Sequence, residues 1–452
     1  MGISSNYLTA TETIALVAQG QLTVEQLALD HLSRYDERDP VVHAWAYVDR
    51  ERILREAKRL DGIPKEQRGP LHGVVLGVKD MMNMPTQSGS PIYKDSRPNV
   101  DAGCVAICRA AGALIFGKTH TTEFACSNVG PPGCSNPYDA ERTPGGSSSG
   151  SAAAVRDFQC SLALGTQTGG SIIRPASYNG VFAIKPTWNA ISTYGLKPYA
   201  TTLDTVGFFA RSIEDLQLLS KVFNINSDIP LSPTIKPLAS SKFAFVKTDQ
   251  WINPTPELQS AWERSASLLR EAGAEVIDLE LPSEFIGISR GSAWTINQAE
   301  GRISFQYEWL NHPDLLGDLV KSHLDSRNTV TQKQLVEAYD KVSSLRPIID
   351  KIASQYDAII TPSVESEATI GLGFTGSPRY NAMWTALHVP CVNIPGFASE
   401  NGMPIGLTLL GPRFNDERLL QVADTVAKVW VGVDQAKLNL IPAPEGALQC
   451  KV

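Results

Sequence analysis

The chain lacks the features that mark membrane proteins, secreted proteins and metalloproteins. Its 452 residues hold no run of eighteen apolar residues that could cross a membrane. Residues 1–17 show no basic segment followed by an apolar block, so we expect no secretory signal. The seven histidines are scattered singly, with no His-Glu-x-x-His or similar spacing. We therefore expect no membrane association, no metal and no cofactor.

Cysteine usage is typical of an intracellular protein. The seven cysteines are an odd number, and no two form a Cys-x-x-Cys pair, so we expect them to be reduced and mostly buried. The single Asn-x-Ser/Thr match contains Pro254 at its middle position, which disqualifies it as a glycosylation site. These observations predict a cytoplasmic protein.

The net charge argues against nucleic acid as a partner. The formal charge is −7, whereas a nucleic-acid-binding protein usually carries a basic stripe. Hydrophobic residues make up 42% of the chain and charged residues 19%, which is ordinary for a folded globular protein. A chain of this length can bury a large core.

Strand and helix patterns alternate along the chain and predict one α/β domain with a mixed sheet. We expect N-terminal helices within residues 1–65, a catalytic core at 69–225 and a helical elaboration at 290–355. Strand patterns occur at 74–78, 113–116, 240–246, 275–281, 358–360, 391–394 and 405–410. Helix patterns are strongest at 103–111, 212–223, 257–272 and 417–430. No repeat or low-complexity linker divides the chain.

Residues 112–119 match the P-loop pattern literally, but we reject a nucleotide site there. A P-loop needs a strand before its first glycine and a helix after its lysine. Here the predicted strand occupies the variable positions of the motif itself. The match is therefore most simply a coincidence of composition.

Two Gly/Ser clusters, at 145–151 and 169–171, form the most unusual part of the sequence. A nucleophile elbow centred on Ser148 is one interpretation, with His388 as its base, although no strand precedes it. A serine activated by a lysine is the second. In the third, the serines only cap helices and turn the chain. The residues alone leave these alternatives open.

Lys79 ends an apolar strand pattern and is followed by Asp80. A lysine at the end of a buried strand is unusual. It could form an ion pair with Asp80, or extend its amine to solvent. Alternatively, burial could lower its pKa and make it a base.

Several segments together resemble the amidase signature family, whose members are Ser-Ser-Lys hydrolases. The resemblance covers nearly the whole chain in the expected order. The segments are 69–73, 77–80, 117–119, 122–124, 143–152, 165–172, 185–187, 203–207, 356–358, 361–362 and 404–407. It implies one large mixed-sheet core covered by helices on both faces.

The resemblance also implies site residues. Ser171 matches the nucleophile and Ser147 the bridging serine, which the family holds after a cis peptide bond; their separation, 171 − 147 = 24, is the family's spacing. Lys79 matches the terminal base. Backbone N–H groups of Thr168, Gly169, Gly170 and Ser171 match the oxyanion hole, which stabilises the tetrahedral intermediate.

Four positions depart from the family's usual pattern. Ser149 stands where glycine is common, Gln167 where aspartate is common and Asn179 where cysteine is common. Ile173 moves the arginine one residue later than usual. None of these positions belongs to the triad.

The implied function is hydrolysis of a small-molecule carboxamide through a seryl acyl-enzyme. An amidotransferase subunit, an acyl transferase and an esterase are alternatives on the same scaffold, and a catalytically inactive binding protein is a third class. We expect a small-molecule amide as the partner, and a homodimer stays open. Pocket walls are expected to include Met82, Cys126, Ser127, Tyr380 and Trp384, which would suit an aromatic or apolar acyl group.

Overall fold

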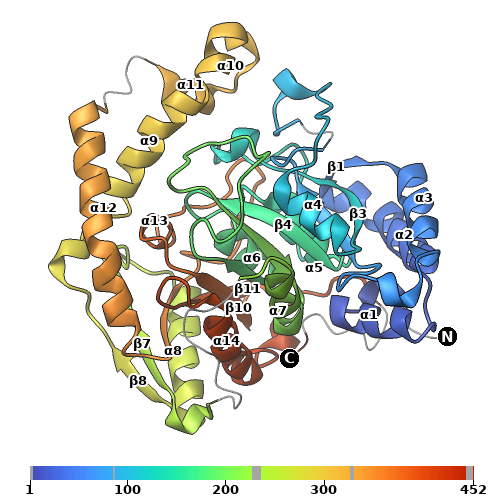
Figure 1. The fold of residues 1–452 in the computed structure, drawn as a ribbon. Helices are drawn as coiled ribbons and strands as arrows, with labels where there is room; N and C mark the ends of the chain where they lie inside the picture. Colours follow the sequence, from blue (N-terminus) through green and yellow to red (C-terminus); the bar gives the residue numbers. More distant parts are fainter. Residues whose placement is uncertain (1–3, 85–86, 226–235, 326–329, 444–450, 452) are drawn as a thin grey trace.

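The computed structural model describes residues 4–84, 87–225, 236–325, 330–443 and 451. One sheet of eleven strands runs through the described part of the molecule, in the order β1-β3-β2-β4-β6-β5-β10-β11-β9-β7-β8 (Figure 1). The pairs β3-β2, β2-β4, β9-β7 and β7-β8 are parallel, and the others are antiparallel. This mixed sheet confirms the predicted α/β class.

The strands are short, and most are buried along their whole length, as expected for a sheet covered on both faces. Their bounds are β1 Trp45–Val48, β2 Val75–Lys79, β3 Leu114–Thr119, β4 Leu162–Gln167, β5 Phe182–Lys185, β6 Thr205–Ala210, β7 Lys242–Phe245, β8 Glu275–Asp278, β9 Ala358–Pro362, β10 Cys391–Ala398 and β11 Pro404–Leu410.

Several helices begin at residues that cap them: the side chains of Thr9, Thr23, Ser212 and Thr255 each accept a backbone N–H three residues later. The α-helix bounds are α1 Ala10–Ala18, α2 Val24–Val42, α3 Arg50–Asp61, α4 Gly103–Ala110, α5 Ser149–Arg156, α6 Ile173–Asn179, α7 Ile213–Val222, α8 Pro256–Glu271, α9 Ser292–Ser304, α10 Gln306–Asn311, α11 Asp318–Leu324, α12 Gln332–Ala353, α13 Ala382–Ala386 and α14 Asp416–Trp430.

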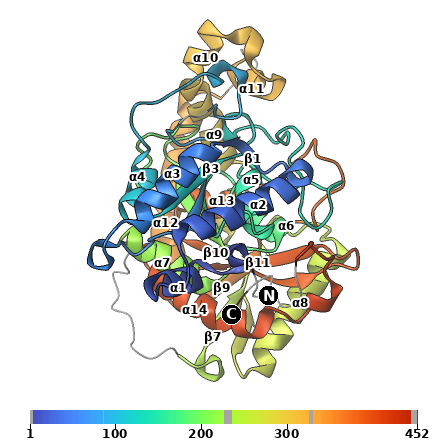
Figure 2. The ribbon, with the colours of Figure 1, turned by 90° about the vertical axis from the view of Figure 1, so that its right-hand side faces the viewer.

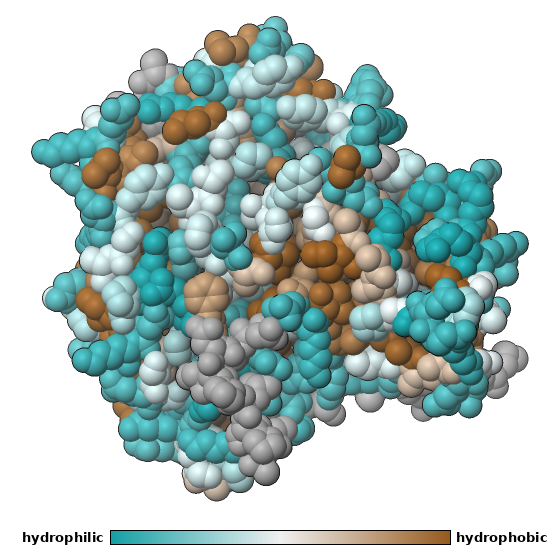
Figure 3. All heavy atoms as spheres, viewed as in Figure 1, coloured by the Kyte–Doolittle hydropathy of each residue, from teal (hydrophilic) through white to brown (hydrophobic). Residues whose placement is uncertain are grey.

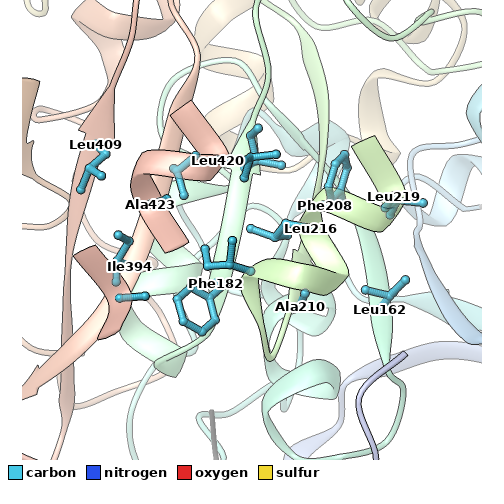
Figure 4. Packing of buried hydrophobic residues seen from close by; sticks show 14 of the residues in the cluster. Leu162, Phe182, Phe208, Ala210, Leu216, Leu219, Ile394, Leu409, Leu420 and Ala423 are labelled. Atoms are coloured by element: carbon cyan, nitrogen blue, oxygen red, sulfur yellow. The ribbon is translucent and has the colours of Figure 1, made fainter. Parts of the chain in front are cut away.

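Hydrophobic residues cover both faces of the sheet. On one face the side chains of β4, β5, β6, β10 and β11 pack against α7 and α14, and Figure 4 shows Phe182, Phe208, Leu216 and Leu420 among these side chains. On the other face, residues such as Phe209 pack against α2, α3, α5 and α6. Neighbouring residues of one strand serve opposite faces because strand side chains alternate. The predicted helical cover on both faces is confirmed.

The helices α9 to α12 lie at the outer edge of the molecule in Figure 1, beyond α13 and the β7–β9 end of the sheet. Of these, α9 and α12 share a hydrophobic cluster with β7, β9 and α13, whereas α10 and α11 contribute to a small cluster around Phe124 and Tyr199. Figure 2 shows α10 and α11 at the top of the molecule, away from the sheet. This segment matches the helical pattern at 290–355, although the division of the chain into subregions stays a prediction.

One local prediction is wrong. Residues 45–48 fall in the N-terminal segment expected to be helical, but they form β1, which pairs antiparallel with β3. The segment is rich in aromatic and β-branched side chains, which favour strands, and it fills the sheet edge beside β3. The strands β4, β5 and β6 are also absent from the sequence-based expectation.

Hydrophilic residues cover most of the face shown in Figure 3, with hydrophobic atoms gathered near its centre. Within the described residues, no helix combines the length and the apolar character needed to cross a bilayer.

Candidate active site

Lys79 is fully buried at the end of β2 and contacts the first Gly/Ser cluster. Its Nζ donates to Ser147 Oγ at 2.8 Å, to Thr166 Oγ1 at 2.8 Å and to the Thr166 carbonyl at 3.3 Å. Asp80 lies elsewhere: its Oδ1 is 3.7 Å from Lys118 Nζ, and it accepts the amide of Gln87. Successive side chains at the end of a strand point in opposite directions. Lys79 therefore interacts with Ser147 and Thr166 rather than with its neighbour Asp80.

The surroundings of Lys79 favour its neutral form. Burial lowers the pKa of Lys79 well below its ordinary value, and the Arg174 guanidinium lowers it further. The Asp204 carboxyl acts in the opposite direction. A neutral amine hydrogen-bonded to a serine hydroxyl can accept a proton through it.

Ser147 follows a cis peptide bond, Gly146–Ser147, at the start of the turn into α5. Arg174 donates from its guanidinium to the Gly146 carbonyl at 2.6 Å. The next residue, Ser148, donates to the Thr166 carbonyl at 3.2 Å, which ties α5 to β4. His388 contacts the Thr202 carbonyl and Arg346 instead of Ser148, so the elbow interpretation gains no support.

The second Gly/Ser cluster forms the turn between β4 and α6 and meets the first one. The amide of Ser148 donates to the Ser171 carbonyl at 3.3 Å, and Ser171 is 7% exposed. Within the described part of the chain, the N–H groups of Gly169, Gly170 and Ser171 donate to no protein acceptor. Unpaired backbone donors beside a serine hydroxyl suit the negative charge of a tetrahedral intermediate.

Glycine is required sterically at Gly170. A Cβ there would lie 2.7 Å from Asn381 Oδ1, and a Cβ at Gly169 would lie 3.2 Å from Pro378. The loop before α13 therefore packs directly on the backbone that carries the free N–H groups. Side chains at these positions would push the loop and the turn apart.

A buried carboxyl holds the start of this turn. Thr168 donates its hydroxyl to Asp204 Oδ1 at 2.5 Å, and Asp204 also accepts the amides of Tyr199 and Ala200. Burial raises the pKa of Asp204 to about 6, although these hydrogen bonds act to lower it. Asp204 lies close enough to Lys79 to influence its pKa.

Gln167 fixes the backbone on the other side of the turn. Its Oε1 accepts the amides of Ile172 and Ile173 at 2.9 and 3.0 Å. Its Nε2 donates to Thr385 Oγ1 at 3.0 Å, and that hydroxyl donates to the Gly169 carbonyl at 2.8 Å. The amide thus makes both the acceptor and the donor contacts, whereas an ionised aspartate could only accept.

The departure at Asn179 is also accommodated by hydrogen bonds. Its Nδ2 donates to the Pro144 carbonyl at 2.6 Å and to the Pro175 carbonyl at 2.8 Å. Ile173 is buried and belongs to the cluster beneath α13. Ser149 is buried, with no hydrogen-bond partner for its hydroxyl within the described residues.

A cavity of about 340 Å³ opens beside Thr168 and Gly169. Its other walls come from α9 with the residues before it and from the loop into α13; they are Ser289, Arg290, Ala293, Trp294, Asn297, Ser377, Pro378, Arg379 and Ala382. The cavity joins the turn bearing the free N–H groups to the outer helices.

The five predicted pocket residues do not line this cavity. Met82, Tyr380 and Trp384 are buried in the hydrophobic core. Cys126 is half-buried, with its thiol donating to the Glu123 carbonyl at 3.5 Å, and Ser127 Oγ accepts the amide of Val129. Their role in substrate binding stays a prediction.

Three side chains at the site are not singled out by the sequence. Thr166 holds Lys79, Arg174 holds the Gly146 carbonyl, and Asp204 holds Thr168. Thr166 and Asp204 lie in segments that carry the family resemblance, and Arg174 follows the second cluster. Polar residues at the ends of apolar strands are the available signal, but only the fold shows which groups they contact.

Known proteins resemble this chain over nearly its whole length. The family model described as Amidase matches residues 26–420. The chain belongs to this family. Among curated relatives, a glutamyl-tRNA(Gln) amidotransferase subunit of Streptomyces avermitilis is 31% identical, with the match covering 94% of this chain and 95% of the relative. The same subunit of Streptomyces coelicolor is 30% identical over 94% of this chain and 96% of the relative.

Solved structures of the family have the same fold. A crystal structure of an amidase has a TM-score of 0.83 and 28% identity, with 93% of this chain and 99% of that chain covered. The peptide amidase of Stenotrophomonas maltophilia has a TM-score of 0.76 and 26% identity, with 96% and 98% covered. The chain therefore spans nearly the full length of these family members.

Proposed function

We propose that this chain is an enzyme that cleaves a carboxamide through an acyl-enzyme on Ser171, with Ser147 and Lys79 as the proton relay. The observation that carries the proposal is the 2.8 Å hydrogen bond between a buried, pKa-lowered lysine and Ser147, beside a turn with three free N–H groups.

In the first step, Ser171 attacks the amide carbonyl while its proton passes through Ser147 to neutral Lys79. The tetrahedral oxyanion is stabilised by the N–H groups of the 168–171 turn, each worth about 3 kcal/mol in comparable sites. Lysinium then returns the proton through Ser147 to the departing nitrogen, and the C–N bond breaks. Ammonia or an amine leaves, and Ser171 stays acylated.

In the second step, water attacks the acyl ester. Lys79, neutral again, accepts the water's proton through Ser147. The bond between the acyl carbon and Ser171 Oγ then breaks, and Lys79 returns the proton through Ser147 to Ser171. The products are a carboxylate and the free enzyme.

This chemistry fits two biological settings. A small-molecule amidase releases its ammonia or amine into solution, which is the first expectation from the sequence. An ammonia-donating subunit of an amidotransferase is the second candidate, and the names of the curated relatives favour it. An acyl transferase or an esterase would use the same acyl-enzyme with a different acceptor or leaving group.

Labelling with a fluorophosphonate probe tests the nucleophile. We expect labelling of the wild type and its loss in Ser171→Ala, with Lys79→Met labelled about 10²–10⁴-fold more slowly. Ser148→Ala is the matched control because it removes a buried hydroxyl of the same region and should retain labelling. If Ser171→Ala is still labelled, the nucleophile assignment is wrong.

Ammonia detection over a panel of amides separates the two settings. The purified chain is assayed with glutamine and with other primary amides, alone and after affinity capture of partners from a lysate. Turnover of other amides by the chain alone supports the amidase. Glutamine turnover that needs a captured partner protein supports the amidotransferase.

A further inference from the structure

The cavity beside Gly169 carries an unusual charge pattern. Two of its walls present guanidinium groups, Arg290 before α9 and Arg379 before α13 (Figure 1 shows these elements side by side). No lining residue within the described part of the chain is acidic. The cavity is lined by Thr168 and Gly169, which belong to the turn that would hold the oxyanion and that carries Ser171.

The two arginines differ in whether their charge is balanced. Arg379 Nε lies 3.1 Å from a carboxylate oxygen of Glu365, and its guanidinium is over the ring of Tyr380. Arg290 is exposed, and within the described residues it makes no ion pair and no side-chain hydrogen bond. One positive charge of the cavity is therefore free to meet an anion.

The remaining walls of the cavity suit a ligand with an apolar chain. Trp294, which is 54% exposed, and Pro378 supply apolar surface, while Ser289, Ser377 and Asn297 supply polar groups. A volume of about 340 Å³ is at the small end of ordinary ligand pockets. The cavity thus accommodates a short acyl chain with a polar far end.

We propose that this cavity binds the acyl part of the substrate and that Arg290 recognises a carboxylate at its far end. The substrate is then the monoamide of a short dicarboxylic acid. A guanidinium binds a carboxylate through two parallel hydrogen bonds, which gives strength and orientation. This proposal rests on the proposed amide hydrolysis.

The same walls disfavour an α-amino acid amide such as glutamine. Its α-ammonium group would lie among guanidinium groups, and the nearby carboxylate of Glu365 is already paired with Arg379. The oxygens of Ser289, Ser377 and Asn297 can accept hydrogen bonds from an ammonium group, but the cavity lining offers it no carboxylate to offset the nearby positive charges. The proposal therefore separates a plain acid monoamide from its α-amino counterpart.

Three amides with the same five-carbon skeleton test the proposal. They are glutaric acid monoamide, the neutral glutaramide, and glutamine, and kcat/KM is measured for each by ammonia release. We expect glutaric acid monoamide to exceed both others by about tenfold or more, as one charge-assisted contact allows. Monoamide and diamide pairs of six and seven carbons cover other chain lengths.

Substitution of the arginine gives the second measurement. Arg290→Gln should lower the ratio of kcat/KM for the monoamide to that for the diamide by about tenfold, and Arg290→Lys should restore part of it. Arg264→Gln on α8 is the matched control, because Arg264 is also exposed without an ion pair in the described residues and does not line the cavity. The control should keep the wild-type ratio.

Binding gives a measurement independent of turnover. Isothermal titration of Ser171→Ala with glutarate should show affinity that Arg290→Gln removes, and glutaramide should bind more weakly. If the diamide or glutamine is the better substrate in the wild type, or if Arg290→Gln lowers both rates equally, the proposal is wrong. If no amide is hydrolysed and Ser171 is not labelled, the proposed function fails instead.

Discussion

Thr385 controls the direction of one peptide group at the candidate site. Its hydroxyl donates to the Gly169 carbonyl at 2.8 Å while accepting from Gln167 Nε2. In a trans peptide the C=O and the following N–H point in opposite directions. Anchoring the Gly169 carbonyl on Thr385 therefore turns the Gly170 N–H to the side away from Thr385, where it is left unpaired among the described residues. Gln167 extends this arrangement by holding Ile172 and Ile173.

Replacing Thr385 should consequently affect the chemical step more than binding. Thr385→Val removes the donor to Gly169 and leaves the Gln167 amide unpaired, so we expect kcat to fall about tenfold with little change in KM. Thr385→Ser keeps the hydroxyl and should restore most of the rate. Steady-state kinetics and the fluorophosphonate labelling rate check this. A rise in KM at unchanged kcat would contradict the positioning role.

At the scale of elements, α5 is held close to the edge of the sheet by a glycine in its first turn. The Gly150 amide donates to the His120 carbonyl at 3.0 Å, and a Cβ at this position would lie 2.0 Å from the Ala44 carbonyl oxygen. The helix can approach the β1–β3 edge this closely only without a side chain. Ser147 and Ser148 precede this turn, so the packing of α5 also places the relay.

We expect Gly150→Ala to lower the free energy of unfolding by about 3 kcal/mol, because the methyl group meets rigid backbone. Ser149→Ala is the neighbouring control: it removes a buried hydroxyl that has no partner in the described residues, and should change stability by less than about 0.5 kcal/mol. Chemical denaturation followed by circular dichroism measures both. Equal destabilisation of the two variants would refute the steric argument.

Local pattern predicts most elements because hydrophobic periodicity and capping residues act over a few positions. The strand before Lys79 and the helix capped by Ser212 are predicted this way. The pattern misses β1 because the aromatic segment that begins at Trp45 is short and flanked by helices. Its pairing partner β3 begins 69 residues later in the chain (114 − 45). Strand pairing over such distances leaves no local signal.

The candidate site shows the same limit. Family resemblance indicates Lys79, Ser147 and Ser171, and the structure brings Lys79 and Ser147 into contact. The cavity residue Arg290 lies in a segment without a recognisable motif, so only the packing of α9 beside the 168–171 turn connects it with the site. Tyr380 and Trp384, which the sequence suggests for the pocket, are buried and do not line the cavity beside Gly169, so their role in substrate binding stays a prediction.

At the scale of the whole molecule, the sheet brings together charged groups that are distant in sequence. Lys79 ends β2, Arg174 lies in α6, and Asp204 immediately precedes β6. All three are buried, and burial shifts the pKa of each of them. Arg174 and Asp204 in addition shift the pKa of Lys79, in opposite directions. Burying ionisable groups lowers the free energy of unfolding. The burial that keeps Lys79 neutral therefore makes the folded protein less stable at neutral pH.

The contribution of buried Asp204 to the free energy of unfolding depends on pH. Its carboxyl has a pKa of about 6 in the folded protein against 3.8 when unperturbed, so between about pH 4 and 6 the folded state binds more protons than the unfolded state. The contribution of Asp204 to stability is therefore complete below pH 4 and is lost as pH rises through 6. Asn keeps one acceptor oxygen for Thr168 without the charge, but its NH2 group cannot accept the amides of Tyr199 and Ala200, so a loss of stability that does not depend on pH is superimposed on the pH-dependent difference. Relative to wild type, Asp204→Asn should gain on the order of 3 kcal/mol between pH 4 and 7, as chemical denaturation across this pH range would measure.

The same substitution should move the activity profile in a defined direction. The Asp204 carboxylate raises the pKa of Lys79, so removing its charge lowers that pKa further and shifts the acid limb of kcat/KM to lower pH. Asp416→Asn is the control: its buried carboxyl similarly accepts from Thr187, at 2.6 Å, but it contacts no site residue. It should change stability and leave the acid limb in place. An acid limb that stays fixed or rises in Asp204→Asn would show that Lys79 does not govern it.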